Sequence, residues 1–159
     1  MNIKIACAGK LKDRFYAEAS AEYAKRLSRF VNLTIAEVAD EKTPDSLSPA
    51  EERQVMTREG ERLLERMRDG EHVIALCVGG RRMTSEAFAE HLQQLGDQGK
   101  NAVTFVIGGS LGLGENVLAR ANERISLSDM TLPHRLCRVF LLEQIYRACK
   151  INAHETYHK

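Results

Sequence analysis

The sequence lacks the features that would place it in a specialised class of protein. No apolar stretch reaches the roughly 20 residues of a membrane-spanning helix, so we expect no membrane partner. None of the four cysteines forms a C-x-x-C pair: Cys7, Cys77, Cys137 and Cys149 are scattered through apolar segments. This pattern argues against a zinc site and is typical of small buried side chains in a reducing compartment. We therefore predict no bound metal and a cytoplasmic location.

An excess of charge of one sign is also lacking, since 23 basic and 22 acidic residues leave a net charge of +1. Net charge alone thus predicts no polyanionic partner. The charges are unevenly distributed, however. Residues 1–39 hold seven bases and four acids, residues 40–71 six and ten, and residues 134–159 five and two. The two basic ends could form a modest positive face for nucleic acid if they meet in space, or remain separate solvated surfaces.

What is present is a regular alternation of strand and helix signals over 159 residues. The length fits one domain, residues 1–159, with a core that needs no disulfide or metal. The chain begins directly with a strand pattern, so we expect no cleaved signal peptide. Strands are expected at residues 3–8, 33–38, 72–78, 102–107 and 124–128, and helices at 13–29, 48–68, 84–95, 115–122 and 133–151. This order predicts an α/β fold, a mostly parallel sheet with helices on both faces.

Two of these segments allow finer expectations. The first helix should be N-capped by Asp13 and should bury one stripe of side chains. That stripe consists of Phe15, Ala19, Tyr23 and Leu27.

The loop at residues 39–48 has no periodicity and should be exposed and mobile. It ends in Ser48, Pro49 and Glu51, the pattern of a capping box that starts the next helix.

A glycine-rich segment at residues 108–114, the glycine turn, directly follows a buried strand. It lacks the lysine of a phosphate loop and the third glycine of the dinucleotide fingerprint. Glu115 at the start of the next helix would also repel an anion. The turn therefore favours an uncharged or cationic ligand over a pyrophosphate; alternatively, it is a tight turn without a ligand.

The carboxyl ends of three parallel strands should meet at residues 76–78, 107–109 and 127–132. Ligands of open parallel sheets lie at this edge. Apolar side chains there could sandwich a flat ring while backbone groups of the loop read its edge. These side chains are Leu76, Leu127, Met130 and Leu132. The alternative is a hydrophobic loop that plugs the sheet.

The last helix is apolar around nearly its whole circumference, so it should be buried on two sides, one of them against another subunit. Glu143 and Arg147 stand four residues apart and should pair, either as an interface ion pair or as a polar pair facing a site. The tail at residues 152–159 carries two of the five histidines and a tyrosine. Such a tail is either a disordered terminus or a ligand-handling segment.

These segments resemble the ribosomal RNA large subunit methyltransferase H family of the SPOUT superfamily. The resemblance covers essentially the whole chain. The matching pieces are ACAGKLK at residues 6–12, EYAKRL at 22–27, VIGGSLGL at 106–113, LSDMTLPHRLCRV at 127–139, EQIYRACKI at 143–151 and YHK at 157–159.

The resemblance implies an S-adenosylmethionine-dependent enzyme that methylates N3 of a pseudouridine in 23S rRNA within assembled ribosomes. It also implies a homodimer and a SPOUT-type fold whose C-terminal segment forms a trefoil knot. The family's cofactor contacts correspond to Leu76, Gly108, Leu127, Ser128, Asp129, Met130, Thr131 and Leu132.

For the reaction itself, the N3–H proton must leave, so a nearby base would help. His154 or His158 is the candidate for this step or for substrate positioning. We predict His154, Arg147 and Glu143 as catalytic residues and Tyr157, His158 and Lys159 as substrate-binding residues.

A different class, a non-enzymatic α/β nucleotide- or RNA-binding module, remains the alternative. A small-molecule hydrolase is disfavoured because no serine or cysteine lies on a nucleophile elbow.

Overall fold

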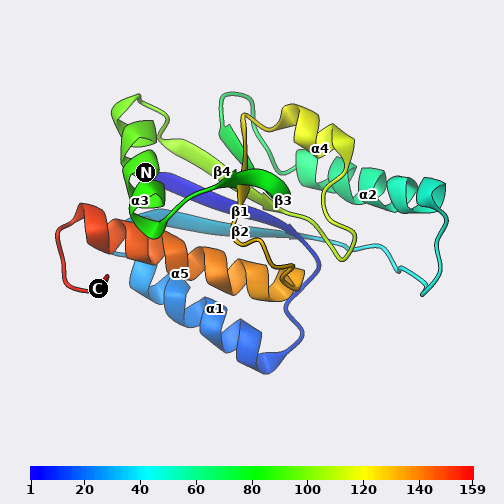
Figure 1. Ribbon diagram of the computed structural model, residues 1–159, viewed down its shortest axis with the longest axis horizontal. Helices are drawn as coiled ribbons and strands as arrows, with labels where there is room; N and C mark the ends of the chain where they lie inside the picture. The colour runs from blue at the N-terminus through cyan, green and yellow to red at the C-terminus, as the bar shows by residue number, and fades with distance from the viewer.

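A computed structural model describes all residues, 1–159, as one five-stranded sheet flanked by five helices (Figure 1). The strands are β1 (Asn2–Ala8), β2 (Asn32–Val38), β3 (His72–Arg82), β4 (Ala102–Ile107) and β5 (Glu123–Ser126). The helices are α1 (Arg14–Leu27), α2 (Pro49–Leu64), α3 (Ser85–Asp97), α4 (Glu115–Arg120) and α5 (His134–Asn152).

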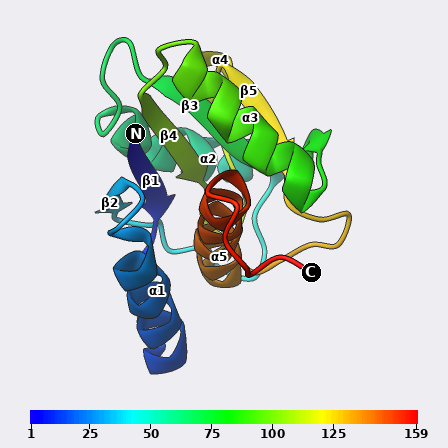
Figure 2. The ribbon, with the colours of Figure 1, turned by 90° about the vertical axis from the view of Figure 1, so that its left-hand side faces the viewer.

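Every strand pair is parallel, and the strand order is β2-β1-β4-β3-β5. Helices α1, α3 and α5 cover one face and α2 and α4 the other (Figure 2). Along β1 the side chains of Ile3 and Ile5 enter the larger core, and that of Ala6 the smaller one. The parallel sheet with helices on both faces is thus confirmed. The trefoil knot stays a prediction. No helix combines the length and apolarity needed to cross a membrane.

Strand β3 is longer than expected, because β5 pairs with it twice. Leu76 and Arg81 both lie opposite Ile125, so the intervening residues bulge out of the sheet. Gly80 permits this close approach, since a Cβ there would lie 2.4 Å from the backbone of Ile125. The bulge leaves Val78 66% exposed at the carboxyl edge.

The first helix differs from expectation at its start. Asp13 occupies the N-cap position, but its side chain makes no capping bond; Oδ2 instead accepts a 2.7 Å hydrogen bond from Arg135 of α5. Phe15 is 64% exposed, so it does not belong to the buried stripe, which reaches full burial only at Leu27. The reason is that α1 projects beyond the sheet at this end (Figure 2).

Helix α2 begins as predicted, with both capping-box bonds between Ser48 and Glu51 formed. It ends at Leu64, four residues earlier than expected, where the Arg66 and Met67 N–H groups donate to carbonyls only three residues back, both at 3.0 Å. The carbonyls beyond this point bind side chains. The Arg66 carbonyl accepts from Lys4 of β1 at 2.8 Å, and the Arg68 carbonyl from Arg120 of α4 at 3.3 Å.

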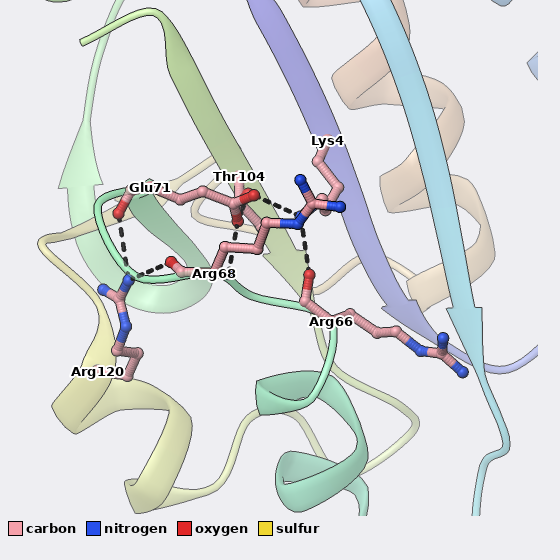
Figure 3. Close-up of polar contacts among 6 residues, drawn as sticks. All are labelled: Lys4, Arg66, Arg68, Glu71, Thr104 and Arg120. Carbon is pink, nitrogen blue, oxygen red and sulfur yellow. Dashed lines mark hydrogen bonds and ion pairs between the residues drawn. The ribbon is translucent and has the colours of Figure 1, made fainter.

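These contacts belong to a charged cluster near the amino ends of β1, β3 and β4 (Figure 3). The Glu71 carboxylate accepts from Lys4 at 2.6 Å and from Thr104 at 2.7 Å, and the Glu71 carbonyl accepts from Arg120 at 3.2 Å. We call Lys4, Glu71, Thr104 and Arg120 the amino-edge cluster. Its contacts tie two strands to the turn before β3 and to α4.

A second charged group closes the same edge beside β5. The Glu123 carboxylate contacts the Nε2 atoms of both His72 and His91, the latter at 2.7 Å. Because the three residues come from β5, β3 and α3, this group fixes the start of the short edge strand.

Candidate functional site

A cavity of about 780 Å³ lies at the carboxyl edge of the sheet, where β3, β4 and β5 end. The expected strand ends meet there and supply its walls. The lining comprises residues 76–78, 107–113, 126–128, 130–134 and 137. The volume lies in the range of roughly 300–1,000 Å³ usual for small-ligand sites. The plug alternative is wrong, because the loop after β5 borders an open cavity.

The side chains that line this cavity include no charged residue. Ten of its 19 lining residues are hydrophobic, and none is an aspartate, glutamate, lysine or arginine. Leu76, Leu127, Met130 and Leu132 all contribute, as the flat-ring hypothesis requires. Without a cation the cavity is poorly suited to a pyrophosphate, whereas an apolar ring and an uncharged or cationic group fit it.

The wall formed by the glycine turn depends on closely packed main chain. A Cβ on Gly108 would lie 2.3 Å from the carbonyl oxygen of Gly112, so the turn closes only with glycine. Gly112 has a φ of +89°, and its N–H donates to the Gly109 carbonyl at 3.1 Å. The tight turn therefore brings main chain at Gly108, Gly109 and Gly112 to the cavity, beside Ser110, Leu111 and Leu113.

The loop after β5 is shaped by serine side chains. Ser126 Oγ donates to the Ser128 carbonyl at 2.8 Å, and Ser128 Oγ accepts from the Met130 N–H at 3.0 Å. Met130 is 79% exposed at the cavity mouth. Asp129 is the one residue of the 127–132 set that does not line the cavity; its exposed carboxylate instead pairs with Arg82 at 2.5 Å.

The structure adds lining residues that the sequence analysis did not assign, chiefly Cys77, Cys137 and His134. His134 Nε2 is buried without a hydrogen-bond partner. Burial, with the charges of Arg135 and Arg138, lowers the pKa of His134, which favours a neutral imidazole. Its position in the sequence could have indicated this residue, because His134 lies two residues after the end of the 127–132 loop.

The C-terminal tail is ordered against α5. Glu143 and Arg147 form the expected i, i+4 pair, with 2.5 Å between Glu143 Oε1 and Arg147 Nη2. Tyr157 donates its hydroxyl to the same oxygen at 3.1 Å, and its ring centroid lies 4.8 Å from Arg147 Cζ. Burial, with hydrogen bonding to Tyr23 and the nearby Glu143 carboxylate, raises the pKa of the Tyr157 phenol.

The two tail histidines have different surroundings. His158 lies 3.3 Å from Arg147 through Nδ1 and 2.8 Å from Glu86 through Nε2. A hydrogen bond from its own backbone N–H and the contact with His158 lower the pKa of Glu86 to about 2. His154 is exposed at the end of α5 with a φ of 54°, and Lys159 is also exposed. The structure therefore groups Glu143, Arg147, Tyr157 and His158, but not His154 or Lys159.

The cavity lies at the start of α5, whereas this tail cluster lies over the middle and second half of the helix, at Glu143 and Arg147. The helix begins at His134, which lines the cavity, and ends at Asn152, just before the tail. Its 19 residues span about 28 Å at 1.5 Å per residue. No residue of the tail lines the cavity. Within one chain, therefore, the two candidate parts of the site are separated.

Comparison with known proteins gives concordant results. The family model described as "Predicted SPOUT methyltransferase" matches residues 1–158. Among curated relatives, the ribosomal RNA large subunit methyltransferase H of Bifidobacterium animalis subsp. lactis is 55% identical over 100% of both chains. The proteins of the same name from Listeria monocytogenes serotype 4b and Lactobacillus delbrueckii subsp. bulgaricus are 54% and 51% identical, again over 100% of both chains.

Solved structures agree in fold. A putative methylase family protein from Neisseria gonorrhoeae aligns with a TM-score of 0.57 and 14% identity, covering 99% of this chain and 86% of its own. A putative methyltransferase from Legionella pneumophila, solved with bound SAM, aligns with a TM-score of 0.52 and 10% identity, covering 93% and 66%. At these identities the likeness shows the arrangement of the sheet and helices.

Proposed function

This chain belongs to the SPOUT methyltransferase family and, within it, to the ribosomal RNA large subunit methyltransferase H group; from this we propose the details of its substrate and site. The family resemblance expected from the sequence is confirmed. The protein is an S-adenosylmethionine-dependent methyltransferase of large-subunit ribosomal RNA. The observation that carries this conclusion is 55% identity over the full length of a curated relative of that name.

The cavity residues fit this cofactor. Apolar side chains of Leu76, Leu127 and Leu132 suit the two faces of an adenine ring, and the tightly closed turn at Gly108 forms the wall beside them. When bound, the cofactor supplies an electrophilic methyl group on a cationic sulfonium, which suits a cavity without lysine or arginine. We propose that Leu76, Gly108 and the loop at residues 127–132 hold it, with Asp129 contributing through its backbone.

For the substrate we propose N3 of a pseudouridine in 23S rRNA, methylated in assembled ribosomes in the cytoplasm. The charge distribution supports a preformed target. Most bases of the two basic ends are already paired with acids; the exceptions are Lys10, Lys12, Lys25 and Lys159. With so few unpaired cations, the two ends should add little affinity for free RNA, because phosphate neutralisation drives nonspecific binding. Equal methylation rates on protein-free rRNA and on ribosomes would contradict this.

We also propose a homodimer in which the tail of one chain acts at the cavity of its partner. No residue of a chain's tail lines its own cavity, and the tail contacts α5 at Glu143 and Arg147, nine or more residues beyond His134. Exposed aromatic side chains on the neighbouring helices α1 and α5, Phe15 (64%) and Phe140 (37%), offer an apolar surface for a second copy. Two sites per dimer would then each combine elements from both subunits.

The tail cluster is suited to handling RNA rather than the cofactor. Glu143 fixes the Arg147 guanidinium, which, with Lys159, can bind phosphate. Tyr157 can stack on a base. Of the two histidines, His158 is held within this cluster, and we assign it the positioning or deprotonation of the N3–H group. His154, exposed and without a side-chain hydrogen bond or ion pair, becomes the control.

The experiment removes residues 157–159 and, separately, changes His158→Ala and His154→Ala. Methylation of ribosomes lacking the modification is measured by mass spectrometry of the rRNA, and the dimer by sedimentation. Truncation should abolish methylation without unfolding the dimer; His158→Ala should reduce turnover by about 100-fold, as for loss of a general base. His154→Ala should stay close to wild type. Unchanged turnover after truncation would exclude the tail.

Calorimetry separates the enzyme from the non-enzymatic alternative. A methyltransferase should bind S-adenosylmethionine and its demethylated product, whereas a pure RNA-binding module should bind neither. Absence of binding by the wild-type protein would overturn the proposed site.

A further inference from the structure

One carboxylate is buried directly behind the cavity wall without lining the cavity. Glu59, on α2, is 3% exposed. Its Oε1 accepts a 2.9 Å hydrogen bond from the backbone N–H of Glu41, whereas Oε2 is buried with no partner. An incompletely bonded buried carboxylate is costly, and folding alone would be better served by an apolar side chain.

On one side this carboxylate touches the glycine turn. A Cβ on Gly109 would lie 2.7 Å from Glu59 Oε2 and 3.0 Å from Oε1, so the carboxylate packs against bare main chain. Gly109 and its neighbours line the cavity. The turn is therefore enclosed between the cavity and Glu59.

On the other side Glu59 contacts the loop at residues 39–47 through the Glu41 N–H. The same loop is attached to α2 by Arg62, which donates to the Ala39 carbonyl at 2.9 Å and to the Glu41 carboxylate at 2.7 Å. Thr43 and Ser110 hydroxyls approach within 3.4 Å. A loop expected to be free is thus connected to the cavity wall, and Glu59 contacts both.

The titration of Glu59 agrees with this placement. Burial raises its pKa, and the nearby carboxylates of Asp40 and Glu41 add to the rise; the N–H groups of Glu41 and Gly109 oppose it. The ionised form is therefore disfavoured by burial and by two neighbouring carboxylates, and it is stabilised by the Glu41 N–H of the loop, while the turn packs against it. The buried Glu59 carboxylate therefore costs folding free energy while it contacts both the 39–47 loop and the glycine turn.

We propose that Glu59 is a positioning residue for the cofactor, which holds the glycine turn in its binding shape and couples that shape to the 39–47 loop. This rests on the proposed function, since it assigns the glycine turn to cofactor binding. Glu59 does not touch the cavity, so it acts through Gly109. Loss of its charge should weaken cofactor binding without destabilising the fold.

The test compares Glu59→Gln with Glu61→Gln, an exposed glutamate of the same helix without an ion pair. Glu59→Gln should melt at the same or a higher temperature and raise the Kd for S-adenosylmethionine about tenfold, the effect of a lost charge-assisted hydrogen bond. The kcat at saturating cofactor should be unchanged, and Glu61→Gln should match wild type. A merely structural glutamate would instead lower the melting temperature and leave the Kd unaltered.

Hydrogen exchange of the cofactor-free protein gives a second readout. In Glu59→Gln the amides of Glu41 and Gly109 should exchange faster together, while those of β1 should not change. Faster exchange in only one segment, or an unchanged Kd, would overturn the coupling. Failure of the wild-type protein to bind cofactor would overturn the proposed function instead, and the exchange result would still decide the role of Glu59.

Discussion

The two edges of the sheet, formed by the amino and the carboxyl ends of its strands, differ in the charged side chains that they carry. At the amino edge, Glu71 and Glu123 each take cationic or imidazole partners, and the chain's carbonyls accept from Lys4 and Arg120. At the carboxyl edge, the cavity has no charged side chain at all, and its polar surface is largely main chain and hydroxyls. The same parallel sheet thus carries a network of ion pairs and hydrogen bonds at its amino edge and an open cavity without charged side chains at its carboxyl edge.

The difference indicates which edge can bind a ligand. Groups at the amino edge already have partners, so a ligand there would have to displace an ion pair. At the carboxyl edge the strands stop at a bulge, a glycine turn and a loop, which leave space and unobstructed main chain. This is the edge at which parallel α/β sheets bind ligands.

The largest expected effect comes from filling the glycine turn. Gly108→Ala would place a methyl group 2.3 Å from the Gly112 carbonyl, which forces the turn open. We expect the affinity for S-adenosylmethionine to fall about 100-fold or more, measured by calorimetry. The amino edge should be unaffected, because the two edges share no contact.

The matched control for this change is Gly79→Ala, where an added Cβ meets nothing within 4 Å. It should bind cofactor as wild type does. If both variants lost affinity equally, crowding of the turn would not be the cause.

An intermediate effect is expected at the amino edge. Glu71→Gln removes the charge that Lys4, Thr104 and the Arg68 N–H share, and should cost about 2 kcal/mol of unfolding free energy while leaving the cofactor Kd unchanged. Denaturant unfolding gives the first quantity and calorimetry the second. A changed cofactor Kd with an unchanged unfolding free energy would contradict the assignment of a structural role to the amino edge and a binding role to the carboxyl edge.

The same variant has a pH signature. Burial alone would raise the pKa of Glu71, but hydrogen bonds from Lys4, Thr104 and the Arg68 N–H bring it below its usual value of 4.5. A depressed carboxyl pKa adds stability above that value, and this stability is lost as the pH falls below it. Wild type should therefore lose stability in acid more steeply than Glu71→Gln.

The smallest effect is expected at the Arg82–Asp129 pair, the charged contact nearest the cavity loop. Both side chains are about 70% exposed, so the pair is weak. Asp129→Asn should change the cofactor Kd by less than about twofold in calorimetry. A larger loss would mean that the carboxylate itself enters the site and that the carboxyl edge is charged when it binds.

Much of the frame was predictable because its signals are local. Strand and helix alternation predicted the parallel sheet, and the Ser48–Glu51 pattern predicted a capping box that forms as expected. Strand ends and their order predicted where Leu76, Gly108 and Leu127 would converge. Each of these follows from periodicity, turn chemistry or the geometry of parallel strands.

The departures depend on which distant parts of the chain come together. Asp13 bonds to Arg135 instead of capping its own helix, and Arg138 lies 4% exposed between Glu37 and the Gly9 carbonyl. Phe15 is exposed because nothing in the chain covers the end of α1. No local pattern encodes a contact across 100 or more residues, so these outcomes were not predictable.

By itself, the sequence determined the layers of the fold, the preference of the carboxyl edge for a ligand other than a pyrophosphate, and the family, because these depend on residue type and spacing. Only the tertiary structure decided that Glu59 lies behind the glycine turn and that the tail lies away from its own cavity. The physical reason is that both depend on how rigid elements are placed: a helix sets a fixed distance, and a buried carboxylate acts only on the backbone that packing brings to it.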